Sequence, residues 1–210
     1  MFYDIGKRIM DIFGALVGIV IFSPLLVLGA LYVKVISPEG PIFADIPFRS
    51  GKDGKPFFMY KFRSMYPGAH EKMLADPALS KKYKENGYKL DPDPRLIPGS
   101  SFLRKSSIDE MPQFFNILKG EMSLVGPRPY FINELVEQVE RYPEAKGYVE
   151  ELKTVKPGLT GPWQVGGRSE LPFIERAKKD AEYAKRRSLL YDLLIILKTP
   201  LAVISCRGAV

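Results

Sequence analysis

The chain has 210 residues, with 31 Lys or Arg against 24 Asp or Glu, and its formal net charge is +7. This length suits one domain whose core needs no cross-links. A single cysteine, Cys206, excludes an internal disulfide and a zinc cluster, and a single histidine, His70, excludes a two-histidine metal site. We expect His70 to lie on the surface. The positive charge fits an anionic membrane surface or a phosphorylated substrate; no basic tail or zinc-finger spacing supports nucleic acid as a partner.

An uncharged apolar run extends over residues 12–33. At roughly 20 residues it is long enough to span a bilayer as a helix. Ser23-Pro24 lies in its middle, and a kink or break is expected there because proline removes one helical hydrogen bond. Both flanks are basic, with Lys7-Arg8 before the run and Lys34 after it, so the positive-inside rule gives no orientation for a span. Two alternatives remain from the residues alone: a kinked transmembrane helix, or a re-entrant helix that returns to the side it entered.

The segment after this run is predicted to form a hairpin. Residues 49–56 are a basic, glycine-rich loop, and residues 57–65 read as a strand in which Lys61 and Arg63 share one face at period two. Residues 42–44 are predicted to pair with this strand across the loop. We interpret the loop as a solvated hairpin tip, because it lacks a Walker pattern that would favour a phosphate cradle.

Most of the remaining chain is predicted to be helical. The expected helices are 69–86 with an interruption at Pro77, 131–141, 173–187, and 189–204 with a break at Pro200. The last is either an interfacial helix or a core helix. Residues 155–168 are rich in proline and glycine and are predicted to be an ordered loop. Its lone Trp163 is either a packing residue or an anchor at a membrane interface.

The residues around Asp109 and Glu110 have the pattern of a site that handles phosphate. Because Pro112 is tolerated only in a first turn, a helix is predicted to begin near Asp109 and to end at Lys119-Gly120. The helix dipole favours the charged carboxylate there, so we expect Asp109 to be ionised at neutral pH. Such a carboxylate beside arginines can attack phosphorus. The alternative is an ordinary helix cap, with Ser107-x-x-Glu110 as a capping box.

Motifs along nearly the whole chain resemble those of the bacterial sugar transferases, the monotopic phosphoglycosyl transferases that start glycan assembly on polyprenyl phosphate. The match is to the family's small catalytic unit, without the additional N-terminal membrane helices of its larger hexose-transferring members. The chain departs from the family pattern at Pro47, where Gln is usual, at Leu96-Ile97, and at Gly166. The matching stretches, in family order, are Lys7-Arg8-x-x-Asp11, Ser23-Pro24, Lys61-Phe-Arg-Ser-Met65, Asp93-Pro-Arg95, Phe102-Leu-Arg-Lys-Ser-Ser-Ile-Asp-Glu-Met-Pro-Gln113, Leu118-Lys-Gly-Glu-Met-Ser-Leu-Val-Gly-Pro-Arg-Pro129, Lys156-Pro-Gly-Leu-Thr-Gly161, Trp163-Gln164, Gly167-Arg168 and Gly208-Ala209.

The resemblance implies a mixed α/β fold that is mostly helical. It places a re-entrant membrane helix at residues 1–36, broken at Ser23-Pro24 and flanked by Lys7 and Arg8. Residues 37–210 are expected to form a catalytic domain with interfacial amphipathic helices and a small β-hairpin or sheet. The implied location is the cytoplasmic face of the bacterial inner membrane, in contact with phospholipid, and a homodimer is compatible with it.

The implied reaction moves a sugar 1-phosphate from a UDP-sugar to undecaprenyl phosphate and releases UMP, as a first membrane step of glycan assembly. A phosphosugar would form on Asp109, and Glu110 would help Asp109 to place Mg²⁺. Two alternatives are kept: a phosphotransferase that uses another nucleotide or acceptor lipid, and a non-catalytic membrane scaffold that retains the fold. The motifs do not identify the sugar. Candidate substrate-binding residues are Lys61, Arg63, Arg104, Pro127, Arg128, Pro129, Gln164 and Arg168.

Overall fold

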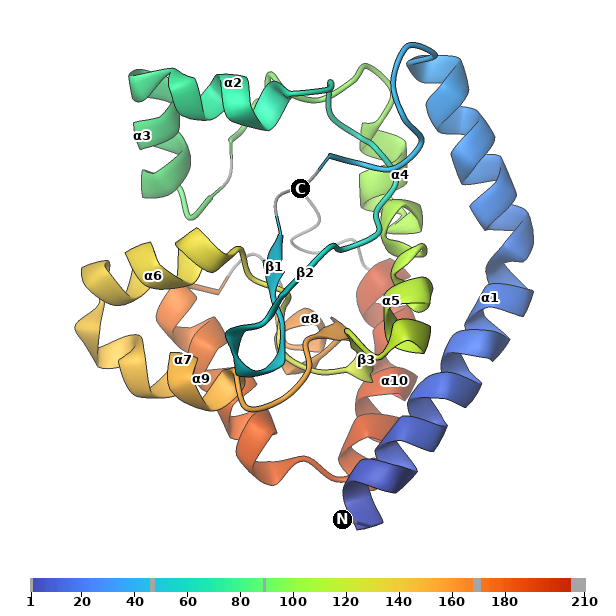
Figure 1. Cartoon of the computed structure of the whole chain (residues 1–210), viewed down its shortest axis with the longest axis vertical. Helices are drawn as coiled ribbons and strands as arrows, with labels where there is room; N and C mark the ends of the chain where they lie inside the picture. Colours follow the sequence, from blue (N-terminus) through green and yellow to red (C-terminus); the bar gives the residue numbers. More distant parts are fainter. Residues whose placement is uncertain (1, 46–47, 89, 168–170, 205–210) are drawn as a thin grey trace.

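The computed structural model describes residues 2–45, 48–88, 90–167 and 171–204, and it is mostly helical with two small sheets (Figure 1). The longest element is α1, Phe2–Ile36. The other helices are α2 (Ala69–Ala75), α3 (Pro77–Glu85), α4 (Ser101–Lys105), α5 (Gln113–Lys119), α6 (Ile132–Arg141), α7 (Lys146–Leu152), α8 (Pro162–Val165), α9 (Phe173–Arg186) and α10 (Leu189–Ile204). Three 3-10 turns are η1 (Lys52–Gly54), η2 (Ile108–Glu110) and η3 (Pro143–Ala145), and the strands are β1 (Arg49–Ser50), β2 (Pro56–Phe57), β3 (Ser123–Val125) and β4 (Gly158–Thr160).

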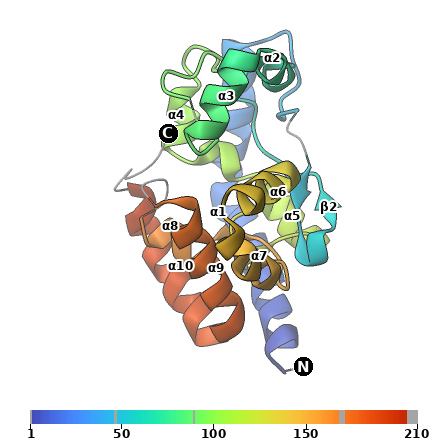
Figure 2. The same ribbon diagram turned by 90° about the vertical axis from the view of Figure 1, so that its left-hand side faces the viewer.

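The elements after α1 form two groups. Figure 2 shows α2, α3 and α4 at one end of the molecule and α6, α7, α9 and α10 at the other. Strands β1 and β2 pair antiparallel, with Arg49 opposite Phe57, while β3 and β4 pair parallel, with Ser123 opposite Gly158. Figure 1 shows β1 and β2 near the middle of the molecule and β3 beside α5, α8 and α10.

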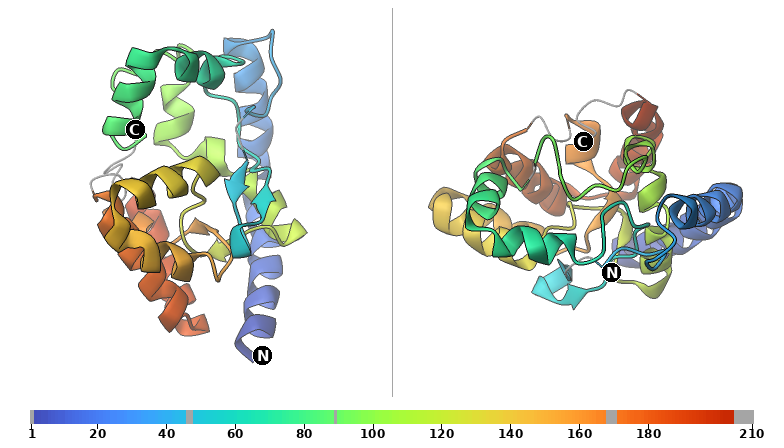
Figure 3. Two further views of the ribbon diagram at one scale, coloured as in Figure 1. Left: turned by 60° about the vertical axis from the view of Figure 1, so that its left-hand side comes forward. Right: turned by 90° about the horizontal axis from the view of Figure 1, so that it is seen from above.

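Helix α1 runs along one side of the molecule, next to α4 and α5 (Figure 3). Its inner face carries small residues that allow a close approach. A Cβ on Gly18 would lie 2.6 Å from the ring of Phe114, and one on Gly29 would lie 2.8 Å from the ring of Phe62. Among the described residues, α1 is the helix that is long and apolar enough to cross a membrane. Its outer face exposes large apolar side chains, namely Phe2, Ile5, Ile9, Phe13, Leu16, Val20, Ile21, Val27, Leu28, Leu31 and Val35.

Both ends of α1 contact the rest of the chain. Near its N-terminus, Arg8 donates to the carbonyls of Ile117 and Leu118 at 2.6 and 2.7 Å, where it caps the carboxyl end of α5. Near its C-terminus, the Tyr32 hydroxyl donates to the Gly99 carbonyl at 3.1 Å. Lys34 donates to the Gly40 carbonyl at 2.8 Å. The helix is therefore docked along its length rather than attached at one end.

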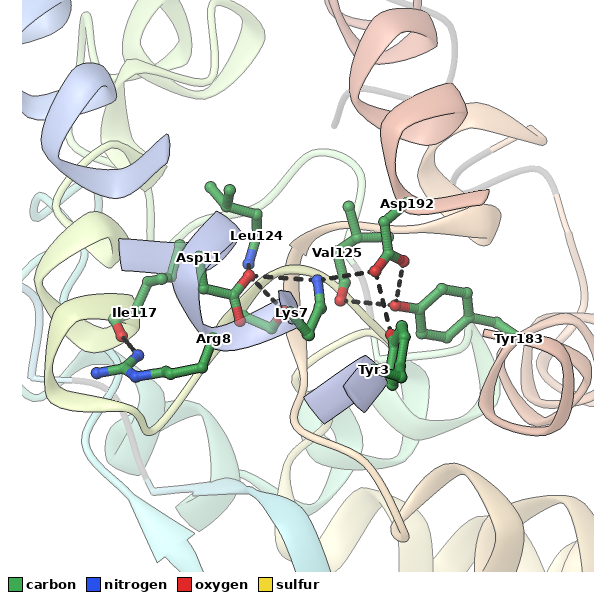
Figure 4. Close-up of polar contacts among 10 residues, drawn as sticks. Tyr3, Lys7, Arg8, Asp11, Ile117, Leu124, Val125, Tyr183 and Asp192 are labelled. Atoms are coloured by element: carbon green, nitrogen blue, oxygen red, sulfur yellow. Dashed lines mark hydrogen bonds and ion pairs between the residues drawn. The ribbon is translucent and has the colours of Figure 1, made fainter. Parts of the chain in front are cut away.

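A buried polar network fixes the N-terminal end of α1, and we call it the N-terminal tether: Tyr3, Lys7, Asp11, Tyr183 and Asp192 (Figure 4). The Lys7 ammonium lies 3.2 Å from Asp11 Oδ1 and 3.3 Å from Asp192 Oδ2. Asp192 is also 3.1 Å from the hydroxyl of Tyr3 and 2.6 Å from that of Tyr183. One lysine thus joins a carboxylate of α1 to a carboxylate of α10.

The tether extends to β3 (Figure 4). Asp11 Oδ1 accepts hydrogen bonds from the Ser123 hydroxyl and the Leu124 amide, both at 2.9 Å. The Tyr183 hydroxyl lies 3.0 Å from the carbonyl of Val125. Because β3 leads directly into Gly126-Pro127-Arg128, the tether connects the N-terminal end of α1 to that segment. Lys7 and Arg8 are predicted as charges that set the membrane topology. In the structure, Lys7 forms ion pairs with Asp11 and Asp192, and Arg8 donates to the carboxyl end of α5.

Several predicted elements differ from the structure. The predicted break at Ser23-Pro24 is not seen as a helix end, because α1 continues through both residues and the Ser23 hydroxyl donates to the Val20 carbonyl at 2.9 Å. Helix α10 likewise continues through Pro200. The predicted loop over 155–168 contains β4 and α8 instead. The strand predicted over 57–65 is regular only in β2, although the pairing of residues 42–44 is confirmed by the bridge between Phe43 and Phe62.

The helices predicted over 69–86, 131–141 and 173–187 are confirmed. The polar segment is divided at Pro77 into α2 and α3, because Asp76 caps the second helix by accepting from the Ala78 amide at 2.9 Å. The predicted helices 131–141 and 173–187 correspond to α6 and α9. Gly120 ends α5 with a φ of 83°, the left-handed conformation expected there.

Candidate active site

One cavity of about 1040 Å³ lies at the centre of the molecule, between α1, the turn η2, the segments after β1 and β3, and α10. Its wall has two parts of different chemistry. The polar part carries cationic and acidic side chains, and the apolar part is supplied by α1 and α10. The residues of the polar part include Asp45, Arg49, Lys61, His70, Asp93, Arg95, Arg104, Asp109, Glu110 and Arg128.

Asp109 points inward because of a local backbone arrangement rather than a helix cap. Ser107 adopts a left-handed conformation with φ 58°, and η2 follows it at once. The Asp109 carbonyl accepts from the Phe62 amide at 2.9 Å, which places the preceding residue, Lys61, beside the Asp109 side chain. Ser107 makes no capping hydrogen bond, so the capping-box alternative is wrong. The helix predicted to begin at Asp109 begins at Gln113, after the turn.

The Asp109 carboxylate is only 1% exposed and forms an ion pair with Lys61, whose Nζ lies 2.9 Å from Oδ2. The same ammonium lies 3.3 Å from Glu110 Oε1. Burial raises the pKa of Asp109 above its ordinary value, and the positive charge of Lys61 opposes this rise. Asp109 is predicted to be ionised at the start of a helix, but it lies in a turn before α5, where burial disfavours its ionised form and Lys61 favours it.

Arg49 and Arg128 lie in a second part of the polar wall. Arg49 is 7% exposed, and its guanidinium carbon lies 3.3 Å from the centre of the Phe131 ring. Burial, with a contribution from Arg128, lowers the pKa of Arg49 to about 9. The Arg128 guanidinium lies 5.1 Å from the centre of the Trp163 ring, and its amide donates to Asp180 Oδ2 at 3.1 Å. Both guanidiniums are therefore held by aromatic faces, which leave their N–H edges for other partners.

His70 also lines the cavity and is half-buried, so the prediction of a surface histidine is wrong. Its ring stacks on Phe131 at 5.7 Å, and Nδ1 lies 3.2 Å from the Nη1 of Arg95. Burial and the positive charge of Arg95 lower the pKa of His70. Arg95 is itself held by Asp93, with Nε at 2.8 Å from Oδ1 and Nη2 at 2.7 Å from Oδ2.

Some of the other site residues predicted from the sequence line the cavity, and others do not. Arg104, Pro129 and Gln164 line the cavity, and Gln164 donates to the Leu159 carbonyl at 3.0 Å. Arg63 does not line it: this fully buried side chain donates to the Pro41 and Ser37 carbonyls, both at 2.6 Å. The alternation of side chains along a strand predicts that Arg63 shares a face with Lys61. In the structure, however, the guanidinium of Arg63 is bound by the residues that follow α1.

Pro127 does not line the large cavity either. Its carbonyl accepts a hydrogen bond from the Gly158 amide at 2.8 Å, which joins the segment after β3 to the start of β4. Arg168 and Pro47 lie outside the described residues. Sequence reasoning missed Arg49, His70 and Arg95 as cavity residues. For Arg95 the signal was the Asp93-Pro-Arg95 spacing, which allows a carboxylate to hold a guanidinium two residues later.

The apolar part of the cavity borders the exposed face of α1. It is lined there by Met10, Phe13, Val17 and Ile21. On the other side α10 contributes Leu193, Ile196, Pro200 and Val203. The outward surface of α10 exposes further leucines, including Leu190, Leu194, Leu197 and Leu201. The polar wall around Asp109 is thus adjacent to an apolar wall that continues toward two exposed apolar helix faces.

The donors near Asp109 suit a magnesium ion only together with a ligand. Within the described residues no group of three or more His, Cys, Asp or Glu side chains converges. Two hard carboxylates, Asp109 and Glu110, face the cavity, and Lys61 contacts both. Magnesium is commonly held by one or two carboxylates, with water and substrate phosphate oxygens as its remaining ligands. The residues therefore fit Mg²⁺ as a co-ligand of a phosphate.

The comparison with family models decides the relationship. The model of the family described as bacterial sugar transferase matches residues 2–206. The chain belongs to the bacterial sugar transferase family. A similar protein, the exopolysaccharide production protein ExoY of Sinorhizobium fredii, is 39% identical over 209 residues, which cover 98% of this chain and 88% of that protein.

Two larger relatives carry more explicit names. The undecaprenyl-phosphate galactose phosphotransferase of Salmonella typhimurium is 40% identical over 206 residues, covering 97% of this chain and 41% of that protein. The UDP-glucose:undecaprenyl-phosphate glucose-1-phosphate transferase of Escherichia coli is 38% identical over 200 residues, covering 92% of this chain and 39% of that protein. This bacterial sugar transferase chain thus spans about two fifths of the larger relatives that it matches.

Proposed function

We propose that this chain transfers a sugar 1-phosphate from a UDP-sugar to undecaprenyl phosphate and releases UMP. The observation that carries the proposal is the placement of a buried carboxylate, Asp109, on the wall of a cavity that is cationic on one side and apolar on the other. A diphosphate needs several positive charges for its neutralisation, and a polyprenyl chain needs an apolar path. The relatives named for undecaprenyl phosphate support this choice of acceptor.

The chemistry proceeds through two displacements at phosphorus. In the first, an oxygen of Asp109 attacks the phosphorus that carries the sugar, the bond from this phosphorus to the UMP oxygen breaks, and UMP leaves with the bonding electron pair. In the second, a phosphate oxygen of undecaprenyl phosphate attacks the same phosphorus, and the Asp109 carboxylate leaves. One anhydride is exchanged for another, so neither step consumes ATP.

The residues of the chain have separate tasks in these steps. Lys61 keeps Asp109 ionised in its buried setting, and Arg104 and Arg128 neutralise phosphate oxygens. Asp109 and Glu110 would hold Mg²⁺, which supplies charge neutralisation to a bound diphosphate. The half of the cavity wall formed by α1 and α10 excludes water from the aspartyl phosphosugar, which is prone to hydrolysis.

We also propose that the chain is monotopic, with α1 as a re-entrant helix and the rest of the chain on the cytoplasmic face of the inner membrane. Support comes from the two docked ends of α1: Arg8 contacts α5, and Tyr32 contacts the segment before α4. A helix that spans the bilayer would carry its two ends to opposite sides, away from a single folded body. The exposed apolar faces of α1 and α10 would then lie in one leaflet.

The experiment that tests the proposed reaction measures UMP release from a panel of UDP-sugars, with undecaprenyl phosphate and Mg²⁺, by protein in nanodiscs. Release that requires the lipid phosphate, together with transfer of radiolabelled sugar to the lipid fraction, supports the reaction and names the sugar. A folded protein that releases no UMP across a broad panel contradicts the proposed donor class. The two alternatives are then a phosphotransferase that uses another nucleotide or acceptor lipid and a scaffold that keeps the fold, and a label transferred to lipid from any donor excludes the scaffold.

A further inference from the structure

Arg49 is a buried cation whose hydrogen-bond donors are only partly satisfied. Its side chain is buried, yet its Nε and Nη1 have no hydrogen-bond partner among the described residues. A buried donor without a partner is costly, and a buried charge is more so, unless a ligand supplies the missing acceptor. Arg49 also lines the cavity, so its guanidinium borders the space in which a ligand would bind.

The position of Arg49 is set by backbone pairing. Arg49 bridges Phe131 across an antiparallel pair, and the Ser50 amide donates to the Tyr130 carbonyl at 2.9 Å. This pairing joins β1 to the segment that follows Arg128, so the two guanidiniums are brought to one region of the wall. The Nε of Arg128 is buried without a partner as well. Two guanidiniums of one wall, each with an unsatisfied donor and close enough for the charge of Arg128 to act on Arg49, suit the binding of a tetrahedral oxyanion.

The charges around this pair leave a positive excess. The guanidiniums of this region belong to the buried Arg49 and Arg176 and to the partly exposed Arg128, and the nearby acids are Glu110, Glu134 and Asp180. Burial raises the pKa of Asp180 to about 7, so this acid gives only part of a negative charge at neutral pH. Because Asp180 is only partly ionised, the positive charges of this region exceed its negative charges, and a bound anion would reduce that excess.

We infer that Arg49 and Arg128 form a phosphate-ester subsite of the cavity, distinct from the carboxylates Asp109 and Glu110 and their partner Lys61. The inference rests on the proposed function for the identity of the ligand, which is either the phosphate that stays on the nucleotide or the phosphate of the polyprenyl acceptor. UMP and the polyprenyl acceptor are both phosphate monoesters, so the same pair of guanidiniums suits either of them. Arg49 binds the ester oxygens directly, and Phe131 holds the face of its guanidinium.

Binding of three probes to the full chain in nanodiscs tests the inference: UMP, uridine and farnesyl phosphate, measured by calorimetry without any turnover. We expect Arg49→Met to weaken the binding of one phosphate ester by roughly tenfold or more, because a charge-assisted hydrogen bond is lost, and to leave uridine unchanged. A selective loss for UMP assigns the subsite to the nucleotide, and a selective loss for farnesyl phosphate assigns it to the lipid. Unchanged affinity for both esters overturns the inference.

Arg176→Met is the matched control, because Arg176 is also buried with an unpartnered Nε but does not line the cavity. An equal loss of affinity in this variant overturns the inference, since it would then reflect loss of any buried guanidinium. The melting temperature of the ligand-free protein gives a second readout: we expect Arg49→Met to melt at or above the parent, because two unpaired buried donors disappear. A lower melting temperature with unchanged ester affinity assigns Arg49 a structural role only.

If Arg49→Met does not fold, Arg49→Lys provides a second test of ester binding. It retains the charge but not the guanidinium, so a weaker ester affinity with a normal fold supports the inference, and a parental affinity contradicts bidentate binding. The outcome is independent of the proposed reaction. A protein that binds UMP through Arg49 but releases none from any UDP-sugar keeps the subsite and loses the transferase assignment.

Discussion

The ammonium of Lys61 lies 2.9 Å from Oδ2 of Asp109, and this contact supplies the positive charge that a carboxylate needs when it is only 1% exposed. Burial by itself favours the protonated acid, which cannot act as a nucleophile. The backbone hydrogen bond from the Phe62 amide to the Asp109 carbonyl fixes the two segments side by side. The proposed nucleophile is thus maintained by a residue 48 positions earlier in the chain.

The first prediction concerns Asp109 itself. Asp109→Asn keeps the shape of the side chain and removes its negative charge, so we expect transfer to be abolished while UMP and UDP-sugar still bind. Calorimetry for nucleotide binding and radiolabel transfer to lipid measure the two properties separately. Glu150→Gln, which changes an exposed acid of α7, serves as a control outside the cavity. Substantial turnover by Asp109→Asn would exclude Asp109 as the nucleophile.

The second prediction concerns the dependence of transfer on pH. In Lys61→Met the charge that opposes the raised pKa of Asp109 is missing, so the carboxylate ionises at higher pH. We expect the ascending limb of the rate–pH profile to move upward by roughly one to three pH units, the usual effect of a close opposite charge. Lys119→Met, which removes an exposed lysine near Tyr60, is the control and should leave the profile in place. An unshifted profile in Lys61→Met would contradict the role given to this ion pair.

The third prediction concerns the N-terminal tether. Lys7→Met leaves Asp11 and Asp192 buried without their shared cation, and we expect the free energy of unfolding to fall by about 3–5 kcal/mol. Adding Asp192→Asn should recover part of this loss, because one of the two unpaired charges disappears. Thermal unfolding followed by the fluorescence of Trp163 measures both variants. A loss in Lys7→Met no larger than that in the surface control Lys146→Met would show that the buried ion pairs carry no stability.

Features that depend on neighbouring residues are predicted from the sequence, whereas features that depend on distant residues are not. Helices 131–141 and 173–187 follow from the periodicity of their own residues, and Asp109 and Arg128 are found through motifs that carry a chemical meaning. Arg49 is not found, because its burial depends on the pairing of β1 with a segment some 80 residues later, which no local pattern encodes. The same reason explains Arg63: its partners, Ser37 and Pro41, are known only once the end of α1 is placed.

The fourth prediction follows from Asp180, which accepts hydrogen bonds from the Arg128 amide and the Tyr130 hydroxyl. Burial raises its pKa from 3.8 to about 7, so between these values the folded protein binds a proton that the unfolded chain releases. The stabilising contribution is therefore complete below pH 3.8 and is lost as the pH rises to about 7. The loss amounts to roughly 4 kcal/mol at most, because each tenfold change in the acid constant corresponds to about 1.4 kcal/mol.

Asp180→Asn should remove this contribution, because the amide does not titrate. We expect the difference in unfolding free energy between parent and variant to change across the window from pH 4.5 to pH 7, with the parent losing more stability on the alkaline side. The exposed Glu144→Gln is the control, and its difference from the parent should stay constant over the same window. A constant difference for Asp180→Asn as well would mean that Asp180 is ionised throughout.

The fifth prediction concerns the membrane placement of α1. A straight helix of 35 residues is about 50 Å long, well beyond the roughly 30 Å of a hydrocarbon core, and its two ends contact the same folded body. If α1 crossed the bilayer, that body and its charged cavity would have to enter the hydrocarbon with it, at a large cost for buried polar groups. We therefore expect both ends of α1 to be accessible from the cytoplasmic side. Single cysteines at Phe2, which is 89% exposed, and at Glu39, introduced into a Cys206→Ser background, report each end.

Labelling of these two cysteines with a membrane-impermeant maleimide distinguishes the topologies. In inside-out vesicles both positions should react as fast as a reference cysteine at the exposed Glu150, and in right-side-out vesicles none of the three should react. Reaction of Phe2→Cys and Glu39→Cys from opposite sides would contradict the re-entrant arrangement. Repeating the labelling with Ser23→Ala and Pro24→Ala tests whether these two residues set the topology, because α1 is continuous through both. If docking of the two ends sets the topology, as the Arg8 and Tyr32 contacts predict, one-sided labelling survives these substitutions; two-sided labelling would instead assign that role to Ser23-Pro24.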